Sequence, residues 1–323
     1  MREEAIKENR HTKAIGGFLA LELPFSVSNH FPPMLSCGRN GLAWILKHIK
    51  CDKIYIPFYI CSVVPELLFE IGVNVAFYHV NESLEPEELP VLQENEYFLY
   101  VNYFGIKNHY CMRLIDLLGD KLILDLTQGF FFDIPVQIKS FSSVQKFFGV
   151  TDGCIVTGVE TEKISALPRY NGAENAKYLL LRLDGRLPEG YSEFVNHGVS
   201  FQEMLQISKL SQHILQCINL QDVAKRRIEN FSVLHAVLGS INLLPDLQKS
   251  VALCYPCLLR NGLEIKKKLC ENKIFIPTYW PHLGEKLSEI EKKFVDNLVC
   301  LPIDQRYNAE DMRYILSKLE DLM

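Results

Sequence analysis

Short hydrophobic runs alternate with amphipathic segments through the first half of the chain. The runs are rich in Ile, Val, Tyr and Phe and are too short for helices, so they predict strands that are buried on both faces. These strands are KIYIPFYI (53–60), VNVAFYHV (73–80), YFLYVNYF (97–104) and KLILDL (121–126), followed by two more at 137–142 and 154–157.

The segments between the first strands have the spacing of helices. In GLAWILKHIK (41–50), the apolar residues Leu42, Ile45, Leu46 and Ile49 fall on one helical face. VVPELLFEIG and CMRLIDLLGD are likewise helix-like segments. Buried strands that alternate with helices indicate an α/β fold with a largely parallel sheet.

The pattern changes in the second half of the chain. From about residue 203 to 240 it is helical, in FQEMLQISKLSQHIL and VAKRRIENFSVLHAVL, and SINLLPD then interrupts it. The remainder is typical of a smaller α/β unit, with a strand at CYPCLLR, a helix at LEIKKKLCENK, a second strand and a closing helix at AEDMRYILSKLEDL. We therefore predict a large domain over residues 1–240 and a small C-terminal domain over residues 241–323.

Composition narrows the class of protein. The 323 residues are 48% hydrophobic and 23% charged, which predicts a packed core rather than disorder. The net charge of −5 counts against nucleic acid as the main partner. No apolar run is long enough to span a bilayer, and the charged start MREEAIKENRHTK has no signal-peptide core. We expect a soluble cytoplasmic protein without a membrane partner.

The ten cysteines and nine histidines lack the spacing of a metal site. The only CxxC motif, Cys254–Cys257, has no second pair, and the histidines form no HxxH or HExxH motif. We interpret the cysteines as reduced thiols that pack as small hydrophobic side chains.

A first candidate for chemistry lies in LSCGRNGLAWIL. Gly38, Arg39 and Asn40 begin an amphipathic helix. The free backbone N–H groups and the positive dipole at a helix N-terminus suit a phosphate, although a simple glycine turn would give the same pattern.

Two further candidates follow strands. Tyr59 and Cys61 lie at the C-terminal end of the first strand, and Asp125 ends LILD. Ligands of open α/β sheets bind at the carboxyl ends of the strands. A buried Asp125 would need a partner, because an unpaired buried carboxylate costs several kcal/mol. Core packing or a structural carboxylate remains the alternative for each of these residues.

The fourth candidate is SSVQKFFGVTDG (142–153), where a strand leads into Ser143 and Lys146. A lone lysine is normally a solvated surface charge. Here Phe141, Phe147 and Phe148 bracket it, so we expect Lys146 to be buried. Burial lowers the pKa of a lysine and frees its amine for Schiff-base formation.

The four candidates together match the needs of one ligand. They offer a phosphate anchor, a residue to cover a ring, a carboxylate for a ring nitrogen and an amine for an aldehyde. Pyridoxal phosphate needs all four, and its ring withdraws electrons only while its nitrogen stays protonated.

The same segments resemble the DegT/StrS family of pyridoxal-phosphate-dependent sugar aminotransferases over nearly the whole chain. The resembling blocks are IGGFLALEL (15–23), SCGRNGL (36–42), IPFYICSVVPELLFEIG (56–72), VNYFG (101–105), LDLTQG (124–129), SVQKFFGVTDG (143–153), FIPTYWP (275–281) and LPIDQRYNAEDMRYIL (301–316). The resemblance implies fold type I, in which a mostly parallel, seven-stranded type of sheet is flanked by helices and followed by a smaller C-terminal α/β domain.

The resemblance also implies roles for individual residues. Lys146 is the catalytic lysine that forms the Schiff base, Asp125 binds the pyridine nitrogen, and Gln128 lies near the phenolic oxygen. The phosphate is held by backbone groups and one hydroxyl, from Gly38, Arg39 and Ser143.

Two features depart from the family pattern. The aromatic residue that stacks on the ring falls at or near Cys61, and we favour Tyr59 as a ring neighbour. Many members also carry an Asn and an Arg that reach the phosphate in the partner subunit. The matching region here, MLQISKLSQHIL, has neither, and Ser208 and Ser211 occupy the neighbourhood.

The function implied by the resemblance is transfer of an amino group from glutamate to a keto sugar. The sugar is commonly nucleotide-linked and destined for polysaccharides or secondary metabolites, and the enzyme is a homodimer. Relatives that dehydrate sugars typically carry histidine at the lysine position, so Lys146 argues against dehydration. A non-catalytic or regulatory protein with a drifted substrate site remains the alternative. Tyr279, Trp280 and His282 are either substrate neighbours or core residues.

Overall fold

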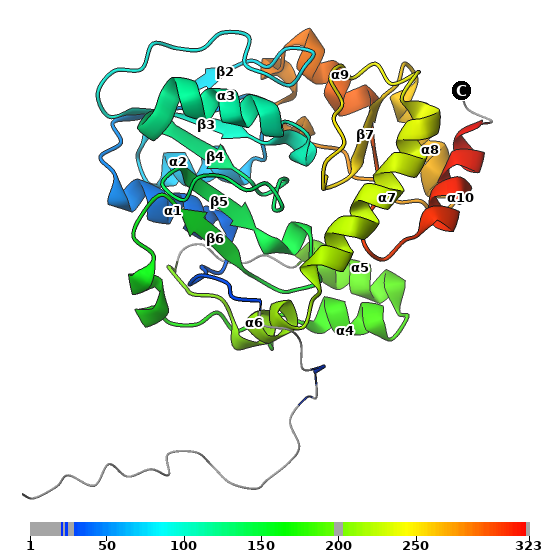
Figure 1. Cartoon of the computed structure of the whole chain (residues 1–323), viewed down its shortest axis with the longest axis horizontal. Helices are drawn as coiled ribbons and strands as arrows, with labels where there is room; N and C mark the ends of the chain where they lie inside the picture. Colours follow the sequence, from blue (N-terminus) through cyan, green and yellow to red (C-terminus); the bar gives the residue numbers. More distant parts are fainter. Residues whose placement is uncertain (1–20, 22, 25–28, 197–202, 321–323) are drawn as a thin grey trace, which may run out of the picture.

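A computed structural model describes residues 21, 23–24, 29–196 and 203–320, without the side chains of His282 and Leu283. Its centre is a six-stranded sheet in the order β2-β1-β3-β4-β5-β6 (Figure 1). The first five strands are parallel, and β6 pairs antiparallel with β5. The strands are β1 Lys53–Pro57, β2 Asn74–Tyr78, β3 Glu96–Val101, β4 Leu122–Asp125, β5 Lys139–Ser143 and β6 Cys154–Thr157.

All six predicted strands of the first half are present, and the predicted parallel α/β class is confirmed. The expectation of a seven-stranded type of sheet is wrong for the described residues, whose central sheet has six strands. The hydrophobic runs extend beyond the ends of the strands because apolar residues continue into the turns. In YFLYVNYF the strand ends at Val101, and the chain then enters the short helix Tyr103–Gly105.

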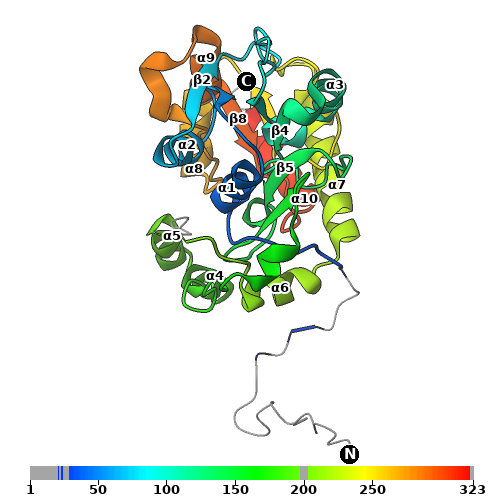
Figure 2. The same cartoon turned by 90° about the vertical axis from the view of Figure 1, so that its left-hand side faces the viewer.

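Helices cover both faces of this sheet. Figure 2 shows α1 and α2 on one side and α3 on the other. The bounds are α1 Gly38–His48, α2 Val63–Glu70 and α3 Asn108–Leu118. Helix α1 lies so close to β5 and β6 that a Cβ on Gly41 would be 2.6 Å from Cys154 Sγ and 3.0 Å from Phe141 Cβ. Only glycine fits this position.

The segment before α1 joins distant parts of the chain. Leu35 and Cys154 exchange backbone hydrogen bonds of 2.9 and 2.7 Å, and the N–H of Ser36 donates to Leu205 O at 2.9 Å. Leu35 also bridges Gln206. The turn that leads into Gly38 is therefore held by residues far along the chain.

Helices dominate from residue 177 onward, as α4 Lys177–Leu183, α5 Leu187–Asn196, α6 Lys209–Gln216 and α7 Leu220–Leu238. The helices α4 and α5 were not predicted from the sequence. The helix predicted at FQEMLQISKLSQHIL is wrong over residues 203–208, which are not helical because Gln206 bridges Leu35 and Arg169. Residues 201–202 lie outside the described part, as does nearly all of the family-like block 15–23.

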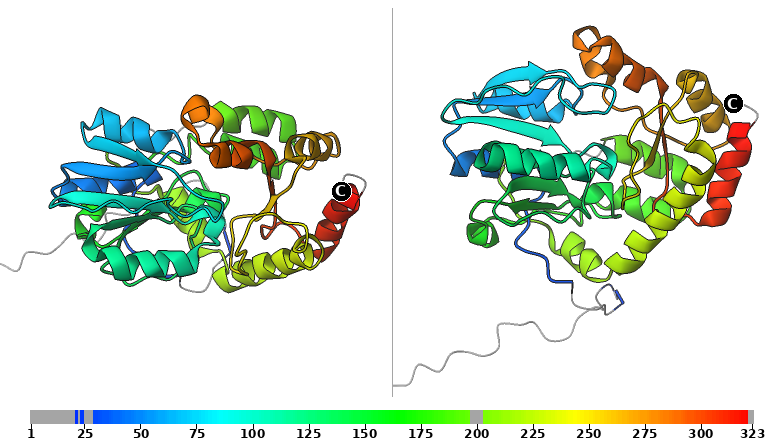
Figure 3. Two further views of the ribbon diagram at one scale, coloured as in Figure 1. Left: turned by 90° about the horizontal axis from the view of Figure 1, so that it is seen from above. Right: turned by 45° about the horizontal axis from the view of Figure 1, so that its top comes forward.

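The C-terminal segment builds a second sheet, from β7 Tyr255–Leu258 and the antiparallel β8 Leu298–Leu301. Around it lie α8 Gly262–Glu271, α9 Glu289–Asn297 and α10 Ala309–Glu320 (Figure 3). The predicted strand, helix, strand and closing helix are confirmed, and α9 is additional. The predicted boundary at residue 240 falls just after α7, and the division into two domains stays a prediction. In the described part of the chain, no helix combines the length and apolar character that a bilayer crossing requires.

A buried carboxylate ties the segment after β5 to α6. Asp152 is completely buried and accepts four hydrogen bonds. The N–H and the hydroxyl of Ser208 each donate to Asp152 at 2.6 Å. The hydroxyls of Ser211 and Thr151 donate to the same carboxylate at 2.5 and 2.7 Å. The negative charge lies at the N-terminus of α6, where the helix dipole favours it.

Replacement of Asp152 by Asn should destabilise the protein by about 3 kcal/mol. An amide offers one acceptor oxygen, so its NH₂ group would face a donor at Ser208 or Ser211. Urea unfolding of Asp152→Asn measures the loss. Asp116→Asn, an exposed position on α3, should change stability by less than about 0.5 kcal/mol. An equally small effect at Asp152 would contradict the role given to this carboxylate.

Candidate functional site

Three of the predicted blocks meet at the carboxyl edge of the large sheet. A Cβ on Gly38 would lie 3.7 Å from Ser143 Cβ and 3.8 Å from Thr127 Oγ1. Gly38 begins α1, Thr127 follows β4, and Ser143 ends β5. Because the carboxyl ends of parallel strands share one edge, segments far apart in the sequence converge here.

The N-terminus of α1 carries no cap of its own. Its N-cap residue Cys37 makes no side-chain cap hydrogen bond, and the first turn has no acidic residue. Asn40 is buried and ties this turn to Ser36 Oγ and to Glu203 O, while its Oδ1 has no partner among the described residues. Backbone N–H groups at an uncapped helix start, with Arg39 beside them, form an anion-binding geometry.

Asp125 ends β4 as a buried carboxylate. It is 7% exposed and accepts a hydrogen bond of 2.9 Å from the N–H of Thr127. Burial raises the pKa of Asp125 to about 6, against the opposing effects of Thr127 and of the charge on Lys146. Within the described residues it forms no ion pair. It is therefore suited to accept a proton-bearing cationic group.

Lys146 is exposed, so the predicted burial of this side chain is wrong. The short helix Val144–Lys146 follows β5 and sends successive side chains in different directions. Phe147 and Phe148 enter a core cluster with Val144, whereas Lys146 faces solvent. Its charge nevertheless acts on Asp125, so the amine is accessible and within electrostatic range of that carboxylate.

Gln128 is fixed by a strained turn after β3. The side chain is 4% exposed, and its Oε1 accepts a 2.7 Å hydrogen bond from the N–H of Phe104. Phe104 has φ 54° and ψ 7°, a left-handed conformation that is costly for a bulky residue. At Gly105, φ is +73° and a Cβ would be 2.6 Å from Gln128 O. Since Oε1 is engaged, the amide nitrogen of Gln128 remains as the donor.

Tyr59 lies in an aromatic cluster between the two sheets. It is fully buried, and its ring centroid is 5.8 Å from Tyr103, 5.0 Å from Trp280 and 5.6 Å from Phe294. The Tyr59 hydroxyl has no hydrogen-bond partner among the described residues. No described ring contact or hydrogen bond joins it to Asp125 or the turn of Lys146, so the role of Tyr59 as a ring neighbour stays a prediction.

Cys61 is half-buried and close to Tyr279. Burial raises the pKa of Tyr279, and the nearby Tyr59 and Cys61 raise it further. Tyr279 in turn packs its ring edge-on against Phe104, at 5.3 Å between centroids. The aromatic residues of TYWPH therefore belong largely to this packing, and the side chain of His282 lies outside the described part.

Ser208 and Ser211 are committed within their own chain. Their hydroxyl groups donate to Asp152 at 2.6 and 2.5 Å, and Ser208 Oγ also caps α6. They do not replace the Asn and Arg expected from the family, because their hydroxyl protons are already used.

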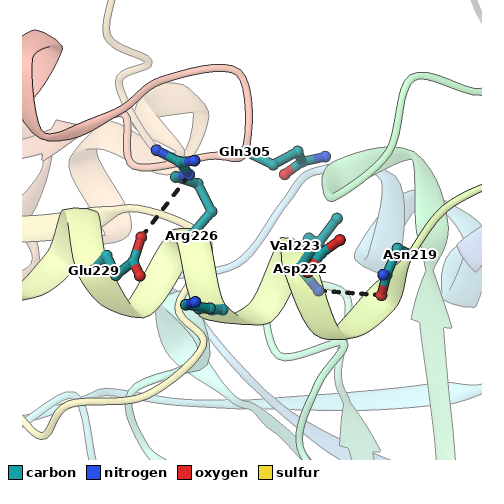
Figure 4. A pocket seen from close by; sticks show the side chains of 7 residues that line it. Asn219, Asp222, Val223, Arg226, Glu229 and Gln305 are labelled. Carbon is teal, nitrogen blue, oxygen red and sulfur yellow. Dashed lines mark hydrogen bonds and ion pairs between the residues drawn. The ribbon is translucent and has the colours of Figure 1, made fainter.

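A cavity of about 450 Å³ lies away from these residues, along α7. Figure 4 shows its lining side chains, which include the ion pair of Arg226 with Glu229 on the helix and Gln305 opposite. None of the predicted site residues lines it. One hydrogen bond of 2.8 Å, from Gln305 Nε2 to Phe147 O, connects its wall to the turn of Lys146.

Two residues that shape the site, Thr127 and Phe104, were not predicted from the sequence. Thr127 lies inside the LDLTQG block and could have been found there, since an Asx-type turn commonly follows a carboxylate at a strand end. The only sign in the sequence of the left-handed conformation at Phe104 was the glycine that follows it, Gly105. Among the described residues, no cluster of three or more His, Cys, Asp or Glu could hold a metal ion.

Comparison with known proteins reveals the fold. No family model and no curated protein sequence matches the chain. Solved structures do match, among them a DegT DnrJ EryC1 StrS aminotransferase from Brucella abortus, at 14% identity and a TM-score of 0.58 over 91% of this chain and 86% of that one.

Two further structures are similar. NtdA from Bacillus subtilis with bound cofactor PMP has 14% identity and a TM-score of 0.63 over 90% of this chain and 74% of that one. PseC from Helicobacter pylori, an aminotransferase involved in the biosynthesis of pseudoaminic acid, has 15% identity and a TM-score of 0.60 over 89% and 85%. The chain thus has the fold of these aminotransferases.

Replacement of Asp125 by Asn should stabilise the ligand-free protein at neutral pH. With its pKa raised to about 6 from an ordinary 3.8, the carboxyl group costs nothing below about pH 4, where it is protonated in both folded and unfolded chains. The cost grows as the pH rises towards 6 and then stays at roughly 3 kcal/mol.

Urea unfolding of the wild type and Asp125→Asn near pH 4 and near pH 7.5 measures this difference. The variant should gain stability only at the higher pH, whereas the exposed control Asp133→Asn should show no such pH dependence. A variant that is less stable than the wild type at pH 7.5 would show that the charge of Asp125 is already compensated.

Proposed function

We propose that this protein is a pyridoxal-phosphate-dependent aminotransferase of the DegT/StrS family that transfers an amino group from glutamate to a nucleotide-linked keto sugar. The observation that carries the proposal is the pairing of a buried Asp125, without an ion-pair partner in the described residues, with the nearby, accessible amine of Lys146. Both lie at the sheet edge where α1 presents its uncapped N-terminus.

The residues present fit the cofactor. Its phosphate would be held by the first N–H groups of α1 at Gly38 and Arg39, with the hydroxyls of Ser143 and Thr127 beside them. The Gln128 amide nitrogen would donate to the phenolic oxygen, since its Oε1 is held by Phe104. When bound, pyridoxal phosphate supplies an aldehyde for an amine and a ring that accepts an electron pair.

Asp125 would keep a proton on the ring nitrogen. A carboxylate whose pKa is raised by burial gains most from an adjacent cation, because the pair restores the stabilisation that water would otherwise give. The N–H of Thr127 donates to Asp125 Oδ1, and the Thr127 side chain also interacts with this carboxylate, so Thr127 holds the carboxylate in place for this contact.

Lys146 would bind the cofactor covalently and then move a proton. Its side chain is not held by any hydrogen bond or ion pair among the described residues, so Nζ can reach and leave a reacting carbon. A general base and acid of this kind typically contributes about 10²–10⁴-fold to the rate.

The substrate class rests on the sequence resemblance and on the fold. The similar structures include DesI in the presence of its TDP-sugar product and PseC of pseudoaminic acid biosynthesis. A role in polysaccharide or secondary-metabolite synthesis, and a cytoplasmic location, are proposed on the same basis.

A regulatory or non-catalytic protein is the second candidate. The engagement of Ser208 and Ser211 with Asp152 favours it, because these residues leave no polar group for a partner's phosphate at this position. The intact set of Asp125, Gln128 and Lys146 favours catalysis.

We also propose a homodimer formed through α4 and α5. Both helices expose apolar side chains, with Leu183 84% and Tyr191 69% exposed. The hairpin lies beside the turn of Lys146, since Tyr178 on α4 donates to Val150 O at 3.0 Å. A second copy placed there would border the exposed Lys146.

The visible absorbance of the protein mixed with pyridoxal phosphate tests the catalytic proposal. The wild type should gain a yellow band that Lys146→Ala lacks, because only Nζ of Lys146 can bind the aldehyde in the site. Glutamate should bleach the band and release 2-oxoglutarate. The control Lys209→Ala, an exposed lysine at the start of α6, should behave as wild type. A band that forms but persists with glutamate favours the regulatory candidate, and no band at all rejects both roles for the cofactor.

Sedimentation equilibrium tests the dimer. The wild type should have twice the mass of one chain, and Leu183→Glu combined with Tyr191→Glu should be monomeric because two charges would be buried unpaired. Leu117→Glu, on the exposed face of α3, is the control and should remain dimeric. A monomeric wild type or a dimeric double variant would contradict the proposed interface.

A further inference from the structure

Arg227 is a buried cation that is held by main-chain carbonyls. It lies in the middle of α7 and is 1% exposed. Its Nη1 donates to the carbonyl oxygens of Ala252 and Leu253 at 3.0 Å each, and its Nη2 lies 3.5 Å from Phe147 O. The guanidinium carbon lies 4.6 Å from the centroid of the Phe147 ring. No carboxylate of the described residues forms an ion pair with it.

Stability alone does not explain this arrangement. Nε of Arg227 is buried without a hydrogen-bond partner in the described structure, and so is Oε1 of Gln305. Burial of a guanidinium and of unpartnered polar atoms is costly, and apolar side chains of similar size would fill the same space without that cost.

Both side chains meet at the carbonyl of the residue that follows Lys146. Gln305 Nε2 donates to Phe147 O at 2.8 Å, and Arg227 approaches the same oxygen. The other backbone hydrogen bonds of this turn stay within residues 144–153, from the N–H groups of Phe147 and Phe148 to Val144 O and from the N–H of Val144 to Gly153 O. The Phe147 carbonyl is thus the point at which α7 and the segment after β8 hold the turn of Lys146.

Arg227 also reaches the opposite wall of the site. Leu253, whose carbonyl it binds, donates its own N–H to Phe104 O at 2.8 Å. The N–H of Phe104 in turn donates to Gln128 Oε1 at 2.7 Å. A continuous set of hydrogen bonds therefore runs from Gln128 through Phe104 and Leu253 to Arg227, and Arg227 packs on the residue next to Lys146.

We propose that Arg227 and Gln305 are positioning residues that set the distance and direction of Lys146 relative to Gln128. This inference rests on the proposed function, because it concerns the site of the cofactor. Neither side chain touches the reacting atoms. They act by fixing the Phe147 carbonyl, and without them no described hydrogen bond joins this carbonyl to α7 or to the segment after β8.

The test follows attachment of pyridoxal phosphate to Lys146. Wild type, Arg227→Met, Arg227→Lys and Gln305→Leu are mixed with pyridoxal phosphate, reduced with borohydride at set times, and the modified Lys146 peptide is quantified by mass spectrometry. The pH at which the visible band is half-maximal is measured in parallel. Loss of position should slow attachment roughly ten-fold or more in Arg227→Met and Gln305→Leu and shift the pH midpoint, with a smaller effect in Arg227→Lys.

Matched controls are Arg226→Met, whose side chain is 43% exposed, and Gln221→Leu, an exposed position on the same helix. Both should attach the cofactor at the wild-type rate. Thermal unfolding separates position from stability. Variants that are less stable but keep the wild-type rate and pH midpoint would overturn the inference alone. A wild-type protein that is never modified at Lys146 would overturn the proposed function and this inference with it. Gln305 is half-buried, so Gln305→Leu provides the test even if Arg227→Met does not fold.

Discussion

The cost of burying charge in an apolar interior governs how this molecule is organised. Three buried charges meet that cost in different ways. Asp152 accepts four hydrogen bonds and is fully compensated within the chain, and Arg227 is held by carbonyl oxygens and an aromatic ring. Within the described residues, Asp125 is stabilised only by the backbone N–H and side chain of Thr127 and by the charge of Lys146. The uncompensated charge is the one at the sheet edge, where a cationic ligand would complete it.

The architecture could be predicted from the sequence because its signals are local. Most strands of the central sheet are short apolar runs, and all six strands, the antiparallel β6 included, were found with small errors at their ends. The helices α4 and α5 were not predicted, because many of their leucines and aromatic residues face solvent and no helical core pattern marks them. The stretch before α6 was wrongly predicted as a helix. Its sequence has a helical pattern, but a bridge to Leu35 keeps it out of the helix.

The site could be predicted only in part. The convergence of Gly38, Asp125 and Ser143 follows from the shared carboxyl edge of parallel strands. The exposure of Lys146 depends on three residues of turn geometry, which flanking phenylalanines do not reveal. Tyr59 lies where it does because Trp280 and Phe294 arrive from more than 200 residues later in the chain, and such contacts leave no local trace in the sequence.

The backbone pairing of Leu35 with Cys154, and of Ser36 with Leu205, has a consequence for biosynthesis. Residues that lead into α1 emerge early from the ribosome, yet their partners are made some 120 and 170 residues later. At typical translation rates this delay is on the order of ten seconds. The turn at Gly38 therefore forms late, after most of the sheet has been synthesised, and a nascent chain that stops short of Leu205 cannot complete it.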